Sequence, residues 1–183
     1  MLKIKKIVSG GQTGADRGGL DAAIEKKVPI GGWVPKGRRA EDGTIPEKYH
    51  GLNETDTDNY LVRNRKNVEM ADLTLIFVSG ERTTGGSRRT EDYCLYHRKW
   101  HIVINTRVMP DLLLSFIVKQ IKFMFSREKN QKEVGLVINV AGSRESKVDG
   151  IQEYTKLFMC GLIDELNGGE CEFTRNNREY NIS

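Results

Sequence analysis

The sequence predicts one domain built on a doubly wound, mostly parallel α/β sheet with helices on both faces. Short apolar runs alternate along the chain with segments of helical periodicity, which is the pattern of successive strand and helix units. The run 73–78 is apolar apart from Thr74, as expected for a parallel strand that is covered on both sides. Glycine-containing turns follow three of the strands, so we expect a ligand at the carboxyl edge of the sheet.

Each expected element has a local signal. Short aliphatic runs bounded by glycine or polar residues predict strands over 4–9, 28–34, 73–78, 102–104 and 134–140. Apolar residues at helical spacing predict helices over 16–27, 58–71, 87–99, 110–125 and 150–166. Asp16 is expected to cap the first helix, and the apolar helix after Pro110 is expected to be buried centrally with some contribution to an interface. Residues 1–183 would form this single domain, with a polar tail, 166–183, that pairs as an edge strand or stays loose.

The composition is that of an ordinary globular protein. Of the 183 residues, 38% are hydrophobic and 30% are charged, which is enough apolar material for one packed core. The first eight residues alternate lysine with aliphatic side chains and lack the long apolar run of a signal peptide, so we expect a cytoplasmic protein without a membrane partner. Cys94, Cys160 and Cys171 form no CxxC pair and are expected to be reduced packing groups.

The basic residues indicate the class of ligand. The formal net charge is only +4, yet seven cations lie in or beside glycine-containing turns, namely Arg17, Lys36, Arg38, Arg39, Arg82, Arg88 and Arg89. This grouping favours a small anionic ligand. A nucleic-acid partner is not expected, because such partners are usually bound by a longer basic stripe with interleaved aromatic residues.

A glycine-rich turn follows the first expected strand. Gly10, Gly11 and Gly14 let the backbone approach a ligand closely, and the free N–H groups at the start of the next helix suit an anion. Gln12 and Thr13 complete this expected cradle. The turn has neither the Gly-Lys-Ser/Thr ending of a Walker A loop nor the Gly-x-Gly-x-x-Gly spacing of a dinucleotide fingerprint. A tight βα connection with glycines for packing is the alternative interpretation.

Two further segments are expected to complete the anion site. A second strand, glycine turn and helix unit contains Gly85, Gly86, Ser87 and Thr90, whose hydroxyl groups can donate hydrogen bonds or cap the helix. A long polar loop, 35–49, follows the second strand, and loops of this length are usually functional or mobile. The cations expected to neutralise the bound anion are Arg17, Lys36, Arg38 and Arg39.

Sequence support for catalysis is weaker. There is no Gly-x-Ser-x-Gly elbow and no His-Glu-x-x-His pair, and the three histidines form no metal constellation, so no catalytic metal is expected. Capping, solvation or ion pairing explains each possible acid–base group equally well, and these groups are Asp16, Glu41, Asp42, Glu54 and Glu91. We therefore favour a binding protein over an enzyme.

Two motifs resemble those of the molybdenum cofactor carrier proteins. The first runs Ser-Gly-Gly-Gln-Thr-Gly-Ala-Asp-Arg-Gly-Gly-Leu from Ser9. The second is more specific and runs Gly-Trp-Val-Pro-Lys-Gly-Arg-Arg-Ala-Glu-Asp-Gly-Thr-Ile-Pro from Gly32. The similarity covers about residues 4–165, and further matching positions include Arg63, Asn67, Asp72 and 139–144. The sequence departs from the family's pattern at Asn64, Arg88, Arg89 and Ser143.

The resemblance implies a Rossmann-like fold, a homo-oligomer that is a dimer or tetramer, and a carried ligand. This ligand is the molybdenum cofactor (molybdopterin), a pterin with a terminal phosphate and a metal oxyanion end. By the same resemblance, the first glycine loop, the cationic loop and the second glycine turn surround the cofactor, and a molybdoenzyme can receive it. The resemblance thus agrees with the small anionic ligand expected from the residues themselves.

Two other functions stay open at this point. One is a phosphoribohydrolase that cleaves a nucleoside monophosphate, as in the related lysine-decarboxylase-like proteins, and the other is a sensor of a nucleotide-derived ligand. The hydrolases use a Gly-Gly-x-Gly-Thr-x-x-Glu motif. Segment 85–91 keeps the glycine pair but loses the third glycine and shifts the glutamate to Glu91, so hydrolysis ranks below binding.

Overall fold

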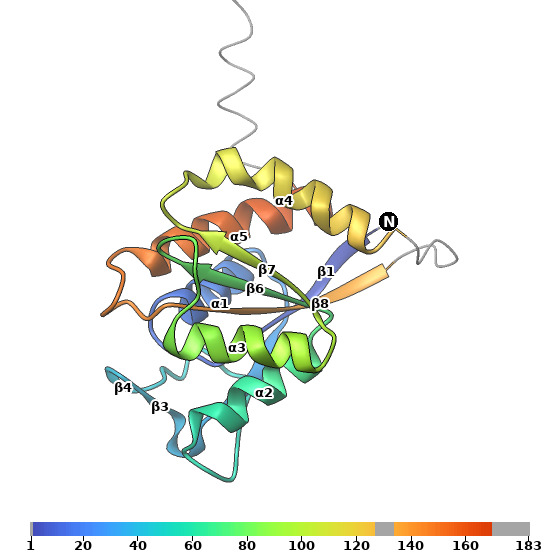
Figure 1. The fold of residues 1–183 in the computed structure, drawn as a ribbon. Coiled ribbons are helices and arrows are strands. Elements are labelled where there is room, and N and C mark those ends of the chain that lie inside the picture. Colours follow the sequence, from blue (N-terminus) through green and yellow to red (C-terminus); the bar gives the residue numbers. More distant parts are fainter. Residues whose placement is uncertain (1, 127–133, 170–183) are drawn as a thin grey trace, which may run out of the picture.

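A computed structural model describes residues 2–126 and 134–169, and a six-stranded sheet runs through its centre (Figure 1). The strand order is β5-β2-β1-β8-β6-β7, and every neighbouring pair is parallel. This confirms the predicted α/β sheet, although the short strand β5 was not predicted. The strands are β1 (Leu2–Ser9), β2 (Ile30–Val34), β5 (Leu52–Glu54), β6 (Leu73–Val78), β7 (Trp100–Asn105) and β8 (Val134–Gly142).

Helices cover both faces of the sheet, as predicted. In Figure 1, α4 and α5 lie on one side, and α2 and α3 lie on the other. The remaining helix, α1, packs along α5. The helices are α1 (Ala15–Glu25), α2 (Tyr60–Met70), α3 (Gly85–Tyr96), α4 (Pro110–Met124) and α5 (Ile151–Asn167).

Two adjacent glycines let α1 pack closely. A Cβ atom at Gly18 would lie 2.4 Å from the backbone oxygen of Gln152 in α5. A Cβ atom at Gly19 would lie 2.6 Å from the Cβ atom of Val140 in β8. Such contacts are shorter than van der Waals distance, so only glycine fits at these positions. The cost of placing glycine in the first turns of a helix is thereby explained by packing.

The last strand of the described residues, β8, lies in the middle of the sheet. β8 pairs with β1 on one side and with β6 on the other, so it joins the two halves of the sheet. The end of α5 lies beside the start of β1, because the side chain of Asn167 accepts from the backbone N–H of Ile4 (2.8 Å) and donates to its carbonyl (3.0 Å). The two ends of the described fold are therefore neighbours.

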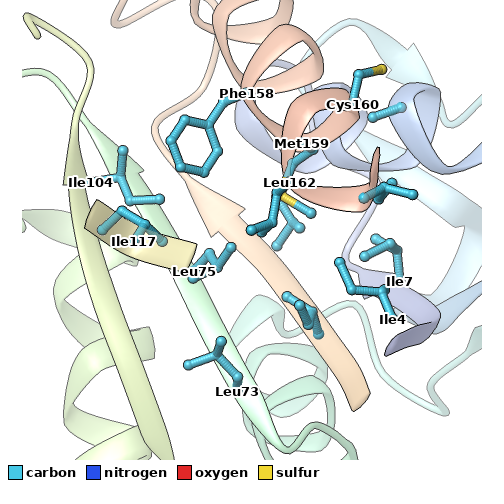
Figure 2. Close-up of a cluster of buried hydrophobic side chains, with 14 of the residues drawn as sticks. Ile4, Ile7, Leu73, Leu75, Ile104, Ile117, Phe158, Met159, Cys160 and Leu162 are labelled. Carbon is cyan, nitrogen blue, oxygen red and sulfur yellow. The ribbon is translucent and has the colours of Figure 1, made fainter. Parts of the chain in front are cut away.

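The main core lies between the sheet and the helices α1, α4 and α5 (Figure 2). Every residue of β6 is buried. The ring of Phe77 in β6 packs edge-on against Phe158 in α5, with 5.5 Å between centroids. The buried thiols of Cys94 and Cys160 are free and agree with the predicted packing role, and burial raises the pKa of Cys94 to about 11. A second, smaller cluster contains Leu20, Val34, Ile45, Tyr49 and Leu52.

The position of α4 corrects the prediction that this apolar helix is buried centrally. Its inner face is buried through four aliphatic residues, Leu114, Ile117, Val118 and Ile121. On its outer side, Leu112, Phe116 and Phe123 are 68%, 57% and 80% exposed. The sequence pattern shows that a helix is apolar all round, but it does not show whether a second layer covers the outer face. Within the described chain, no helix is both long and apolar enough to cross a membrane. Most of the predicted tail, together with Cys171, lies outside the described residues.

Candidate functional site

Three loops meet at the carboxyl edge of the sheet, where β1, β6 and β8 end. The loop after β1 joins the loop after β8 through a hydrogen bond from the N–H of Ala15 to the carbonyl of Ser143 (3.1 Å). The N–H of Ser143 in turn donates to the carbonyl of Phe77 in β6 (2.9 Å). A Cβ atom at Gly85 would lie 3.7 Å from Nζ of Lys147, so the second glycine turn borders the same loop. The carboxyl edge is where ligands bind in open parallel sheets.

The first glycine loop is buried beneath other parts of the protein. Gly10, Gly11, Gln12, Thr13 and Gly14 are all buried. The N–H of Gln12 donates to Oδ2 of Asp16 (3.3 Å), and the N–H of Thr13 donates to Oε1 of Gln12 (3.0 Å). From the sequence, these N–H groups are predicted to donate to an anionic ligand. In this structure, the acceptors are oxygens of the protein's own side chains.

Asp16 does not cap α1, which corrects the prediction. The helix begins at Ala15 and Gly14 takes the N-cap position with a φ of 76°, a conformation that favours glycine. Asp16 lies in the first turn and forms an ion pair with Arg63 of α2 (3.0 Å), with side chains that are 5% and 10% exposed. Burial raises the pKa of Asp16, and the Arg63 guanidinium opposes this shift.

Arg63 explains why the first loop contains Gly10. A Cβ atom at Gly10 would lie 1.6 Å from Nη1 of Arg63, so the guanidinium group lies directly on the backbone of the loop. The guanidinium carbon of Arg63, Cζ, is 5.9 Å from the ring centroid of Tyr60, within the range of a cation–π contact. A charged group thus lies buried against the loop that was predicted to bind an anion.

The long loop 35–49 folds into a short 3₁₀ turn, η1 (Lys36–Arg38), and a hairpin of two short strands, β3 (Arg39–Ala40) and β4 (Gly43–Thr44). The tip of the hairpin carries Glu41 and Asp42, which reach back to the first glycine loop. Oγ of Thr13 donates to Glu41, and the N–H of Glu41 donates to Oε1 of Gln12 (2.9 Å). Arg17 holds Asp42 through two hydrogen bonds of 2.6 and 2.7 Å.

Both hairpin carboxylates are stabilised in the ionised form. Burial alone would raise the pKa of Glu41, but hydrogen bonds from Ser146 and Thr13 outweigh it and lower this pKa below its usual value. The Arg17 guanidinium lowers the pKa of Asp42 in the same way. The hairpin tip therefore presents two negative charges to the first loop.

The four cations predicted for the site have different positions. Arg17 lies in it, and its Nε donates to the carbonyl of Gly11 (3.2 Å). Arg38 braces the long loop instead, through hydrogen bonds to the carbonyls of Ile45, Pro46 and Tyr49. Arg39 forms an exposed ion pair with Asp58 (3.0 Å), and Lys36 is exposed at the start of the loop.

The second glycine turn is more open than the first. Gly85 and Gly86 are exposed at the start of α3, and among the described residues nothing lies within 4 Å of a Cβ atom built at Gly86. Ser87 and Thr90 are buried, and Oγ1 of Thr90 donates to the carbonyl of Gly86 (3.1 Å). Thr84 occupies the N-cap position of α3.

Three residues of the edge were not among the predicted site residues. They are Arg63, Arg144 and Ser146. Ser146 donates to Glu41 from Oγ (2.6 Å) and from its N–H (3.3 Å), and Nη1 of Arg144 lies 3.8 Å from the same carboxylate. The sequence contains one signal for such buried polar residues, because α2 has few apolar residues on any one face. Arg63, Asn64 and Asn67 fill that face and are buried.

Glu91, the residue relevant to the hydrolase alternative, contacts residues of the loop before α3, of α3 itself and of β7. It accepts from Oγ1 of Thr83, and Nη1 of Arg88 and Nε2 of His101 lie 3.4 and 3.8 Å from its carboxylate oxygens. Over residues 2–126 and 134–169, no three histidine, cysteine or carboxylate side chains are grouped so that they could hold a metal ion.

Comparison with known proteins identifies the family. The sequence matches the circularly permutated YpsA SLOG family over residues 7–163. The chain belongs to this family. The two ends of its described residues are neighbours, which is the geometry that a circular permutation requires.

A solved structure of a relative gives the second comparison. This chain is similar to the crystal structure of a Putative molybdenum carrier protein from Syntrophus aciditrophicus SB, with 38% sequence identity and a TM-score of 0.76. The match covers 87% of this chain and 94% of that chain. It confirms the resemblance predicted from the motifs and the Rossmann-like fold. No curated protein matches this chain.

Proposed function

We propose that this protein binds and carries the molybdenum cofactor, or a similar phosphate-bearing pterin, at the carboxyl edge of its sheet. The observation that carries the proposal is the arrangement of Arg17, Arg63 and Arg144 around the first glycine loop. Guanidinium groups beside backbone N–H donors recognise phosphate and other oxyanions. The similarity to a protein named as a molybdenum carrier narrows the choice of anion.

Carriage needs tight contacts and exclusion of water, and it needs no nucleophile. In this proposal, the loop Gly10, Gly11, Gln12, Thr13 and Gly14 with Arg17 binds the anionic end of the cofactor. The exposed turn at Gly85 and Gly86, with Ser87 and Thr90 behind it, receives the remainder, and Lys36, Arg38 and Arg39 contribute positive potential. The protein would act in the cytoplasm as a homo-oligomer that passes the cofactor to a molybdoenzyme.

Native mass spectrometry tests this function directly. The protein is purified from a host that makes the cofactor and from a matched host in which cofactor synthesis is blocked. We expect a mass increase equal to the cofactor in the first sample and none in the second. Failure of the first sample to carry the cofactor, even after incubation with it, would contradict the proposal.

A pair of double variants tests the role of the cationic loop. Lys36→Ala with Arg39→Ala removes two exposed charges from the proposed site, whereas Lys119→Ala with Lys122→Ala removes two exposed charges from α4. We expect the first pair to reduce the occupied fraction and the second pair to leave it unchanged. Arg38 is omitted because it braces the loop, so its removal would disturb the fold as well as the charge.

The hydrolase alternative predicts a different product. The purified protein is incubated with AMP, and ribose phosphate is measured over time. We expect none to form, because the proposed function is binding. Release that is lost in the Glu91→Gln variant would instead assign the protein to the hydrolases.

A further inference from the structure

The Glu41 carboxylate lies in a set of donors that is suited to an oxyanion. Thr13 donates to it from Oγ1, and Ser146 donates from both Oγ (2.6 Å) and its backbone N–H (3.3 Å). Nη1 of Arg144 lies 3.8 Å away. Two hydroxyls, one N–H and one guanidinium around a single group are the donor types that bind phosphate in proteins.

The charge that remains without the hairpin suits a dianion. The ion pairs of Arg17, Arg63 and Arg144 are with Asp42, Asp16 and Glu41, so among these six groups only the Asp16 carboxylate would remain beside the three guanidinium groups if the hairpin tip left. Three positive charges and one negative charge leave a formal charge of +2. A phosphate monoester and molybdate both carry about two negative charges at neutral pH.

Two buried donors at this place are left without an acceptor. Within the described residues, Nε2 of Gln12 and Nε of Arg63 have no hydrogen-bond partner. Gln12 is 4% exposed and Arg63 is 8% exposed, so water does not freely solvate them. Buried unpaired donors are costly, and a pair of them beside one glycine loop indicates a missing acceptor.

The structure of the hairpin allows its tip, Glu41 and Asp42, to move away from the first glycine loop while its base stays packed. Its strands have two residues each and pair only with one another in the described sheets. At its base, Ile45 is buried against the first loop and Pro35 is buried next to β2, and Arg38 fastens the adjacent carbonyls. Gly37 and Gly43 have φ angles of 75° and 116°, so glycine lies on each side of the tip.

We propose that Thr13, Arg144 and Ser146 form an oxyanion subsite, and that Glu41 occupies this subsite as an internal ligand until a phosphate or metal-oxyanion group displaces it. Displacement releases Asp42 from Arg17 and opens the first glycine loop to the rest of the ligand. The hairpin 39–44 thus keeps the empty site neutral and closed. The inference rests on the proposed anion-binding function and names the subsite that performs it.

Isothermal titration of the protein with inorganic phosphate, and separately with molybdate, tests the subsite. If the hairpin is open in about one molecule in ten, closure weakens apparent affinity about tenfold. We therefore expect Glu41→Gln to raise affinity for the dianion about tenfold. The matched control is Glu47→Gln, which removes an exposed carboxylate from the same segment and is expected to change nothing. Adding Arg144→Gln to the Glu41→Gln variant is expected to reverse the gain.

The two anions distinguish the source of the group. Tighter binding of phosphate assigns the subsite to the phosphate end of the ligand, and tighter binding of molybdate assigns it to the metal end. An unchanged affinity in Glu41→Gln, or an equal gain in Glu47→Gln, would overturn the inference. The protein for these titrations comes from the host in which cofactor synthesis is blocked, so no cofactor competes for the subsite. The result therefore tests the subsite separately from the mass-spectrometric test of cofactor carriage.

Hydrogen exchange on the unmodified protein gives a second measurement that needs no variant. The N–H of Glu41 bonds to Gln12, and the N–H of Ser146 bonds to Glu41. On saturation with the anion, we expect the amide of Glu41 to exchange faster, while the amide of Ser146 stays protected by the new ligand. Binding that leaves both amides unchanged would place the anion elsewhere and refute the displacement of Glu41.

Discussion

At the scale of the residue, the pair of Asp16 and Arg63 orders the first glycine loop. Asp16 accepts from the N–H of Gln12, and the guanidinium group of Arg63 lies close against Gly10. Both side chains are buried, so each charge depends on the other for compensation. Removing one partner of such a pair leaves an uncompensated charge in the interior.

The Arg63→Met variant measures this dependence. We expect it to lower the free energy of unfolding by about 3–5 kcal/mol, because Asp16 remains buried without its partner. Urea denaturation gives the value. The double variant Asp16→Asn with Arg63→Met is the control and should lose less than the two single variants added together. Additive losses would show that the two side chains act independently.

Individual contacts also show what could not be predicted from the sequence, namely which residues pair with one another. Arg17 was predicted to balance the charge of a ligand, and the structure shows it beside the first loop with Asp42 as its present partner. These two residues are 25 positions apart, and no local period connects them. The same holds for Thr13, whose Oγ1 accepts a hydrogen bond from the N–H of Glu145, 132 positions away (3.4 Å). The residue type predicts that a side chain carries charge or forms hydrogen bonds, whereas its partner depends on tertiary contacts.

At the scale of the element, the turn between β1 and α1 depends on Gly14. Its φ is 76° and its ψ is −130°, a region that glycine alone enters readily. A Cβ atom there would also lie 2.5 Å from the carbonyl oxygen of Ser143. Backbone conformation and crowding therefore both require glycine.

Comparing Gly14→Ala with Gly150→Ala measures what the conformation and the crowding at Gly14 together add to the ordinary strain of a left-handed residue. Gly150 has a similar φ of 74°, but in the described chain nothing lies within 4 Å of the position that a Cβ atom would take there. We expect Gly150→Ala to cost about 1 kcal/mol, from backbone strain alone. Gly14→Ala should cost more than about 3 kcal/mol, because its ψ of −130° lies in a region that alanine does not enter readily and because crowding is added to this strain. Thermal and urea unfolding would measure both losses, and equal losses would contradict the requirement for glycine at position 14.

The predicted elements agree with the structure where local patterns are strong. The expected run 73–78 coincides with β6, and the other predicted strands overlap observed ones. β5 and the hairpin strands β3 and β4 were not predicted, because two or three residues are too few to show a period. The burial of α4 was predicted incorrectly because hydrophobicity does not identify what covers each face.

At the scale of the whole molecule, the outer face of α4 is an exposed apolar surface made of Leu112, Phe116 and Phe123. Trp100 is a further large exposed apolar residue, 53% exposed on β7, which is the edge strand beside β6 in the described sheet. Large exposed apolar groups of this kind are typical of contact surfaces between proteins.

The homo-oligomer implied by the family remains a prediction, and this surface provides its test. The variant Leu112→Ser, Phe116→Ser, Phe123→Ser removes three exposed apolar side chains without changing the buried face of α4. We expect the unmodified protein to sediment as a dimer or tetramer and the variant to sediment as a monomer, because apolar burial stabilises association. Sedimentation velocity measures both masses. A variant that keeps the oligomeric mass would exclude this surface as the interface.

The central position of β8 also has a consequence for how the chain acquires its fold. β1 and β6 are neighbours only through β8, and Leu2 pairs with Val134. The six-stranded sheet cannot close until the chain as far as Gly142 has been synthesised. Such long-range pairing carries a large entropy cost before it yields contacts, and it slows folding. We expect the earlier strands to emerge as an incomplete sheet with two open edges, so that the nascent chain is prone to aggregate until β8 is inserted.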